Sequence, residues 1–138
     1  MNQETIRLAG CLLKNKNGDC LLIHRNIGNS KQWELPGGKI KINESSKLTA
    51  ERELKEEMNV VVKAGDLIAV NKFTENQINY TYYIHSGEIL EGVLEILEKN
   101  KFDKFAYFSK EQLKTSANHL SINMKLFATL FIAACAHS

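Results

Sequence analysis

Residues 37–60, GGKIKINESSKLTAERELKEEMNV, constrain the fold more than any other segment of the chain. Glu53, Glu56 and Glu57 are spaced i, i+3 and i+4, so a helix here places the three carboxylates on one face. Like charges this close destabilise an isolated helix by roughly a few tenths of a kcal/mol per pair, whereas a hard divalent cation such as Mg²⁺ binds them. The three glutamates alone favour a solvated acidic face, and a metal site is the alternative.

The boundaries and the second face of this helix can also be predicted. Ser45 or Ser46 can cap its start, and we expect the helix to run to about Met58. Ala50, Leu54 and Met58 form an apolar stripe beside the acidic one. We therefore expect the apolar stripe to pack on a sheet, which leaves the acidic stripe open to a cleft.

A longer pattern surrounds the glutamates and favours the metal site. From Gly38, five residues lead to Glu44, seven more lead to Arg52, and the run ELKEEMNV follows as far as Val60. This pattern resembles the Nudix box, G-x5-E-x7-R-E-U-x-E-E-x-G-U, in which U is a bulky aliphatic residue. The one departure is Asn59, which stands where the family has its second glycine. Asn tolerates the left-handed conformation that closes a helix, so we expect the turn to be kept.

The resemblance implies both a fold and an activity. The expected class is α/β (α+β), an α/β/α sandwich around a mixed β-sheet, in which the box is a loop–helix catalytic element. The expected reaction is the Mg²⁺-dependent hydrolysis of a nucleoside diphosphate linked to a group X, with Mn²⁺ as a substitute ion.

Three readings of the substrate follow from the resemblance. We favour the MutT-like branch, which cleaves nucleoside triphosphates, oxidised ones among them, to monophosphate and pyrophosphate. A dinucleotide or nucleotide-sugar diphosphatase is the runner-up. A module that senses a nucleotide without turnover is the third, although the intact glutamates argue against it.

The resemblance also assigns roles within the box. Glu56 and Glu57 are expected to hold the ion. Glu53 is expected to act as the general base or as a third ligand, and Arg52 to orient it. Glu44 is expected either to bind the metal or to pair with the arginine.

Residues on either side of the box extend the resemblance. The stretch WELPGGK, residues 33–39, is similar to the family's sequence ahead of the box and implies that a backbone carbonyl of Gly37 joins the metal shell. Residues 98–101, EKNK, resemble a Glu-Pro-x-Lys signature of relatives that act on nucleoside triphosphates, with Lys99 in place of the proline. This similarity makes Glu98 an extra ligand or the catalytic base, and an ordinary exposed glutamate is the alternative.

Three further residues are candidates for substrate contacts. Arg25 ends an expected strand and suits a phosphate contact, and an exposed strand-end charge fits it equally well. Lys39 could reach a phosphate, although a lone lysine is usually solvated. Trp33 could line the substrate pocket, although we expect core packing. Residues 70–83, VNKFTENQINYTYY, also resemble these relatives and are expected to shape the base pocket.

The rest of the chain reads mainly as strands. We expect strands at residues 5–13, 20–25, 60–73, 78–85 and 101–108. Asn17-Gly18 predicts a hairpin turn after the first of them. Gly65-Asp66 predicts an interruption of the third, and residues 86–88 predict a turn after the fourth.

The C-terminal segment is expected to form a helix. Its predicted range is residues 118–136, preceded by a short helix that Ser109 caps. Its expected buried face consists of apolar residues at helical spacing, namely Leu120, Leu126, Phe127, Leu130 and Phe131.

Composition bounds the remaining possibilities. At 138 residues, with 43% hydrophobic and 25% charged residues, the chain suits one globular domain spanning residues 1–138. A formal net charge of +2 is too small to argue for a nucleic-acid or membrane partner. The family resemblance implies a small nucleotide as the partner. Three scattered cysteines without a Cys-x-x-Cys pair predict reduced thiols and a cytoplasmic protein. We expect a monomer or a homodimer.

Overall fold

The computed structural model describes residues 4–136, with side-chain surroundings as far as Ala133. Residues 1–3, 137 and 138 of the expected domain, and the side chain of Cys135, lie outside the described part. The elements in chain order are β1 (Thr5–Leu12), β2 (Cys20–Ile27), β3 (Ser30–Glu34), β4 (Gly37–Lys39), α1 (Ser46–Met58), β5 (Val61–Glu75), β6 (Ile78–Glu91), β7 (Phe102–Phe108), α2 (Lys110–Thr115), the 3₁₀ helix η1 (Ala117–His119) and α3 (Ile122–Ala136).

The turn between β1 and β2 forms where the sequence predicts it. Gly18 adopts a φ of +80°, which an L-residue with a side chain rarely adopts. The side-chain oxygen of Asn15 accepts hydrogen bonds from the N–H groups of Asn17 and Asp19, both at 3.0 Å. Beyond the turn the two strands diverge into different sheets, so the predicted hairpin is confirmed only at its tip.

The strands form two sheets. The larger has the order β4-β1-β6-β5, in which β1 and β6 run parallel and the other neighbours antiparallel. The smaller has the order β3-β2-β7 and is antiparallel throughout. The expected mixed sheet is therefore confirmed, with a second sheet beside it.

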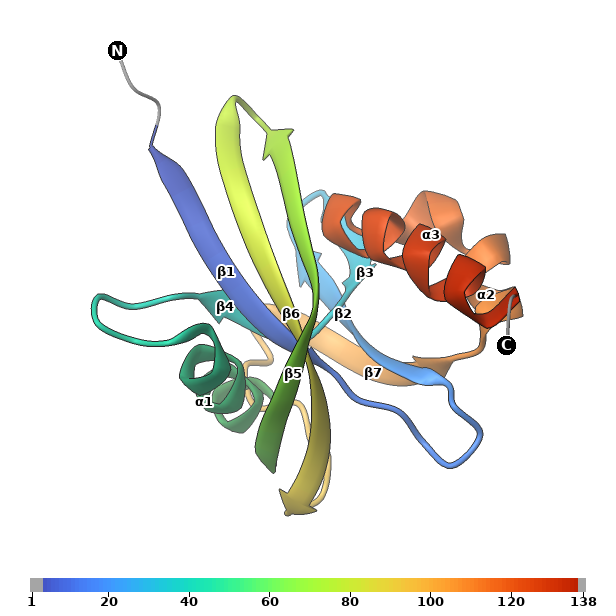
Figure 1. Ribbon diagram of the computed structural model, residues 1–138, viewed down its shortest axis with the longest axis horizontal. Helices are drawn as coiled ribbons and strands as arrows, with labels where there is room; N and C mark the ends of the chain where they lie inside the picture. The colour runs from blue at the N-terminus through green and yellow to red at the C-terminus, as the bar shows by residue number, and fades with distance from the viewer. Residues whose placement is uncertain (1–3, 137–138) are drawn as a thin grey trace.

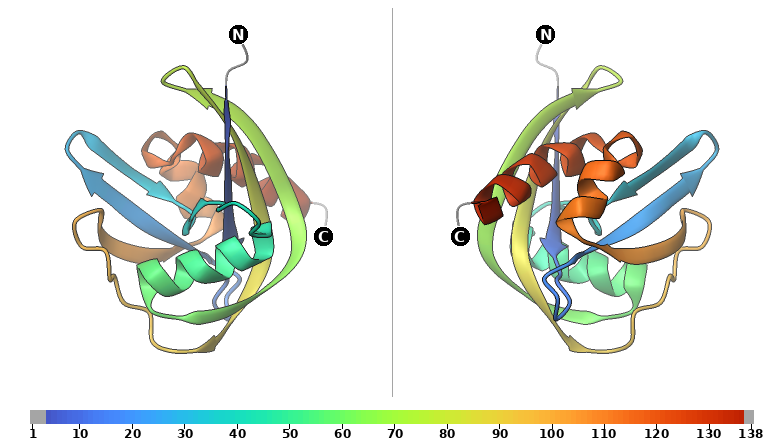
Figure 2. Two further views of the ribbon diagram at one scale, coloured as in Figure 1. Left: turned by 90° about the vertical axis from the view of Figure 1, so that its left-hand side faces the viewer. Right: turned by 90° about the vertical axis from the view of Figure 1, so that its right-hand side faces the viewer.

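The helices lie on opposite sides of the strands. Figure 1 shows α1 on one side of the sheets and the pair α2 and α3 on the other, and the two side views in Figure 2 agree. The order of layers is helix, strands, helices, so the expected sandwich is confirmed. Helix α1 is therefore separated from α3 by the strands that position both.

The core is split between the two sides because successive residues of a strand point to opposite faces. On β2, Leu21 packs in a cluster with Leu54 of α1, whereas Leu22 packs in a cluster with Met124 of α3. All four side chains are fully buried. Strand β2 thus carries apolar residues at successive positions because both of its faces are covered.

Strands β5 and β6 are longer than the sequence predicts. The expected break near Gly65-Asp66 is a bulge, at which the pairing register shifts between Ala64 and Leu67 while the strand continues. The expected turn at residues 86–88 is wrong, because β6 runs on to Glu91 and Gly87 pairs with Ala64. Pairing with β5 overrides the local preference of these residues for a turn.

The C-terminal helix starts later than predicted. Residues 117–119 form η1, and α3 begins at Ile122. Between the two, Ser121 donates its N–H to the carbonyl of Trp33 at 2.8 Å, which ties this segment to β3. The extended backbone required by that bond ends any continuous helix from residue 118.

The predicted buried face of α3 is partly wrong. Phe127 and Phe131 are buried as expected, but Leu126 and Leu130 are 41% and 55% exposed. Met124 and Ala128 take their places in the core. Because apolar residues occur on every face of this helix, the sequence does not show which face is buried. No described helix is both long enough and apolar enough to cross a membrane.

Candidate active site

Helix α1 has the caps that the sequence predicts. The Ser45 hydroxyl oxygen accepts the N–H of Leu48 at 3.1 Å, so Ser45 is the N-cap. At the other end Asn59 is left-handed, with φ 60° and ψ 30°, and donates its N–H to the carbonyl of Lys55. The substitution of Asn for the box's second glycine therefore keeps the turn.

The three glutamates of α1 lie in different environments. Ala50, Leu54 and Met58 are fully buried, so the apolar stripe faces the strands as predicted. Glu57 is next to this stripe and only 3% exposed, Glu53 is half-buried and Glu56 is exposed. The exposure of the three side chains therefore increases from Glu57 to Glu53 to Glu56.

Strand β4 lies directly against the two less exposed carboxylates. The N–H of Gly37 donates to Oε1 of Glu57 at 3.0 Å. A Cβ atom at Gly38 would overlap the carboxyl group of Glu53, so only glycine permits this approach. The Gly-Gly pair ahead of the box is thus needed to bring the backbone against both carboxylates.

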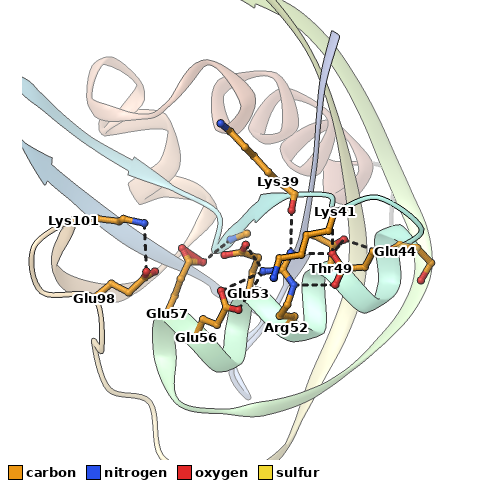
Figure 3. A network of polar contacts seen from close by, with 12 residues as sticks. Lys39, Lys41, Glu44, Thr49, Arg52, Glu53, Glu56, Glu57, Glu98 and Lys101 are labelled. Carbon is orange, nitrogen blue, oxygen red and sulfur yellow. Dashed lines mark hydrogen bonds and ion pairs between the residues drawn. The ribbon is translucent and has the colours of Figure 1, made fainter. Parts of the chain in front are cut away.

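Arg52 joins the remaining acids of the box into one network, which Figure 3 shows along α1. Its guanidinium donates to both oxygens of Glu44 at 2.9 Å, to Oε1 of Glu53 at 2.9 Å and to the Glu56 carboxylate at 3.2 and 3.3 Å. It also donates to the Lys39 carbonyl at 3.0 Å. Arg52 therefore fixes Glu53 relative to both the helix and β4.

Glu44 pairs with the arginine, which is one of the two roles expected for it. Besides Arg52, its carboxylate accepts the Thr49 hydroxyl at 2.6 Å and the Lys41 N–H at 3.3 Å. The hydrogen bonds from Arg52 and Thr49 lower its pKa to about 2. These donors hold Glu44 as an anion that stabilises the loop before α1.

Among the described residues, Glu57 forms no ion pair, and Glu53 shares Arg52 with two other carboxylates. Burial raises the pKa of Glu57 well above the usual range, and the charges of Glu53, Glu34 and Glu98 raise it further. Burial also raises the pKa of Glu53. Such a group of carboxylates fits an added cation, which removes the repulsion. Among the side chains that the structure describes, residues 4–133, no three acidic, histidine or cysteine groups converge as a complete ligand set, so a bound ion also requires side-chain rotation or other oxygen ligands.

Glu98 reaches this site from the connection between β6 and β7, as Figure 3 shows. The backbone N–H of Leu97 donates to the carbonyl of Glu57 at 2.9 Å, so the connection is fastened to the C-terminal end of α1. The Glu98 carboxylate forms an ion pair with Lys101 at 3.4 Å. Its charge raises the pKa of both Glu53 and Glu57, so Glu98 adds to the negative charge of this site.

A cleft of about 330 Å³ adjoins the carboxylates. Gly37 and Gly38 form part of its wall, and Glu34 lies beside them. The rings of Phe73 and Tyr80 line it from β5 and β6, and they stack on each other with centroids 5.2 Å apart. The segment expected to shape a base pocket therefore does line the cleft.

The three predicted substrate residues differ in position. Arg25 lines the cleft and forms a two-pronged ion pair with Glu34, whose oxygens lie 2.8 to 3.2 Å from its nitrogens. Trp33 packs against the core and contacts the ring of Phe108, as expected, and it is not part of the cleft wall. The Lys39 side chain points away from the carboxylates.

Several residues in or beside the cleft are not singled out by the sequence. Glu34 lies inside the WELPGG stretch, so its position beside the glycines was the available signal. Asn71 and Asn123, at the start of α3, are both buried, and their side chains are hydrogen-bonded at 2.9 Å. They are 52 positions apart, and no local pattern links them. Tyr82 lines the cleft as well.

Comparison with known proteins agrees with this geometry. The NUDIX domain family matches residues 5–130. Similar solved structures include a MutT protein from Methanosarcina mazei Go1, with a TM-score of 0.81, 23% identity and coverage of 95% of each chain. Another is the E. coli ORF135 protein, with a TM-score of 0.76, 21% identity and coverage of 98% of this chain and 94% of that one.

A third similar structure has a different substrate in its name. A C. elegans Ap4A hydrolase matches with a TM-score of 0.75 and 16% identity, over 96% of this chain and 99% of that one. At these identities the likeness shows the fold and leaves the substrate open. No curated protein sequence matches the chain. Nudix hydrolases generally use divalent metal ions and act on small nucleotides. The family match over most of the chain shows that this protein belongs to the Nudix family of pyrophosphohydrolases.

Proposed function

We propose that the protein is a MutT-like enzyme that hydrolyses a nucleoside triphosphate, oxidised forms included, to the monophosphate and pyrophosphate with Mg²⁺. The observation that carries the proposal is the continuity between the cleft and the carboxylates. Gly37 and Gly38 belong to both, because they line the cleft and contact Glu57 and Glu53. A ligand in the cleft therefore has one end beside the acidic face of α1.

The lining of the cleft also suits a nucleoside. Phe73 and Tyr80 offer aromatic surface, and every base has a flat face that stacks on such rings. Asn123 and Ser121 add polar groups to the wall. Arg25, held by Glu34, provides a guanidinium that suits a phosphate oxygen. The wall of the cleft thus combines aromatic and amide groups with charged ones.

Bound Mg²⁺ would offset the charge of the phosphates and lower the pKa of water. Glu56 and Glu57 would hold it, together with the carbonyl of Gly37. We assign Glu53 as the general base, because it is half-buried beside the proposed ligands and its raised pKa makes its carboxylate a stronger base. Glu98, across the cluster, is the alternative base or a further ligand.

Arg52 acts on Glu53 by position. Its hydrogen bond to Oε1 leaves the other Glu53 oxygen available for a proton. Glu44 holds the other edge of the guanidinium, so the orientation of the base depends on a residue that need not touch the substrate. This division of roles accounts for both Glu44 and Glu53 without requiring Glu44 as a metal ligand.

A substrate panel tests the proposal. Purified protein with Mg²⁺ should convert a nucleoside triphosphate, ordinary or oxidised, to monophosphate and pyrophosphate at a higher kcat/KM than dinucleoside polyphosphates or nucleotide sugars. Preference for either of those groups would instead make the protein a dinucleotide or nucleotide-sugar diphosphatase. Binding of nucleotides without any released phosphate or pyrophosphate would support the sensing module. Glu57→Gln protein is the control for contaminating hydrolases.

A further inference from the structure

The hydroxyl of Tyr82 is a buried polar atom without a partner. Tyr82 lies in the middle of β6 with its ring in the core beside α3, and the residue is 7% exposed. Among the described residues that are not exposed, its hydroxyl is the one buried side-chain nitrogen or oxygen with no hydrogen bond. Leaving such a group unpaired costs roughly 1–3 kcal/mol, so its retention needs an explanation.

Packing alone does not explain the hydroxyl. Gly10 of β1 and Gly37 of β4 are paired across the sheet, and the Tyr82 hydroxyl lies against both. A Cβ atom at Gly37 would overlap this oxygen, and one at Gly10 would lie 2.5 Å from it. Phenylalanine would fill the ring's part of the core equally well. The two glycines therefore make room for an oxygen atom at this position.

Gly37 connects the hydroxyl to the acidic site. The same residue that contacts the Tyr82 hydroxyl donates its N–H to Glu57. The Glu57 carboxylate is buried, and this N–H is the one hydrogen-bond donor that the described residues give it. Burial raises the pKa of the Tyr82 phenol, and among the neighbouring charges that raise it further, that of Glu57 has the largest effect. A donor without an acceptor and a carboxylate short of donors thus lie on two sides of one glycine.

We propose that Tyr82 is a positioning residue, whose hydroxyl donates a hydrogen bond to the Glu57 carboxylate when a divalent cation is bound. The inference rests on the proposed function in assigning Glu57 as a ligand. An ion takes up part of the carboxylate, and ligating carboxylates are themselves held by hydrogen bonds. The Tyr82 hydroxyl supplies that second donor from the core side, so the side chain stays in position as the ion binds.

The test compares Tyr82→Phe with Tyr83→Phe. Tyr83 is the next residue of β6, on the opposite face, where its ring lies under Arg7. Mn²⁺ binding is measured from the signal of free Mn²⁺ by electron paramagnetic resonance, without any nucleotide. Tyr82→Phe should bind Mn²⁺ about 10 to 100 times more weakly than the wild type, because loss of a group that supports a ligand has effects of about this size. Tyr83→Phe should bind it normally.

Thermal unfolding of the metal-free proteins separates positioning from packing. Tyr82→Phe should melt at the same temperature as the wild type or higher, since it loses an unpaired hydroxyl. A lower Tm of Tyr82→Phe would show that the hydroxyl has a hydrogen-bond partner in the metal-free protein. Equal Mn²⁺ affinities of Tyr82→Phe and wild type would show that the hydroxyl has no role in metal binding. Either result overturns the inference. If the substrate panel finds no hydrolysis, the Mn²⁺ comparison still decides the role of Tyr82. If it finds hydrolysis, kcat should fall in Tyr82→Phe with KM unchanged.

Discussion

Two glutamates at opposite ends of the box have opposite surroundings. Glu44 precedes α1 and is held by Arg52, Thr49 and a backbone N–H, which lower its pKa to about 2. Glu57 is in the last turn of α1, is buried with one backbone donor, and has a raised pKa. The first carboxylate is neutralised by the protein's own cation. The second is not, which is what a site for an added cation requires.

Arg52 lies between the two regions and explains the difference. Its guanidinium donates to Glu44, Glu53 and Glu56. Glu57 instead accepts a hydrogen bond from the N–H of Gly37. One guanidinium faces three carboxylates, so the group as a whole remains negative. Spacing in the sequence therefore places the acids together, and the partners of each acid decide whether it supports the structure or suits an ion.

The largest effect on activity is expected at Glu57, whose carboxylate has no cationic partner among the described residues. Glu57→Gln should lower kcat by at least ~10², because the site loses a ligand and with it metal activation. The same variant should not be less stable without metal at pH 8, since it removes a buried charge that lacks a cation. Steady-state kinetics and thermal unfolding measure the two effects. Near-normal turnover would remove Glu57 from the metal site.

The next largest effect is expected at the shared cation. Arg52→Ala should lower the free energy of unfolding by roughly 1–3 kcal/mol, because it leaves partly buried carboxylates unpaired. Arg52→Lys is the matched control, which keeps the charge but cannot bind Glu44 with two nitrogens and should recover part of the stability. Urea unfolding measures both variants. Equal stability of Arg52→Ala and wild type would contradict the network.

The ion pair of Glu44 predicts that the stability of the protein depends on pH. The pKa of Glu44 is lower in the folded protein than its ordinary value of 4.5. Folding is therefore favoured by this group above pH 4.5, and the contribution is lost as the pH falls toward about 2. Glu44→Gln should accordingly be less stable than wild type at pH 7, and the difference should shrink by pH 2.5. A difference that stays constant across this range would rule out the ionised pair.

The smallest effect is expected at Asn59. Its left-handed backbone suits glycine better than asparagine. Asn59→Gly should therefore raise the free energy of unfolding by less than about 1 kcal/mol, with a slightly higher Tm. Because Asn59 does not contact the carboxylates, kcat should stay the same. Asn59→Ala is the contrasting variant and should lower Tm. A change of kcat in Asn59→Gly would mean that the turn affects the site.

The sequence predicts the acidic site better than the cleft. The spacing of Glu53, Glu56 and Glu57, the Ser45 cap and the Asn59 turn depend on neighbours in the chain, and all are found as predicted. The cleft depends on residues far apart in the sequence, such as Phe73 and Asn123, which no local pattern joins.

The errors in the fold have the same cause. Residues 86–88 look like a turn until β5 pairs with them, and the buried side of α3 cannot be chosen from a helix that is apolar all round. Long-range pairing and packing decide both features. They also decide which tyrosine of the YTYY run reaches the glycines beside Glu57.

The carboxylates of α1 that lack a cation of the protein should hold a divalent cation, and metal-dependent thermal unfolding can detect this binding. Thermal unfolding of wild type and Glu57→Gln is followed at pH 8 as Mg²⁺ is added, without nucleotide. A ligand that binds only the folded state raises Tm with its concentration. We expect Tm to rise in wild type and to stay nearly constant in Glu57→Gln. An equal rise in both proteins, or none in wild type, would contradict the account.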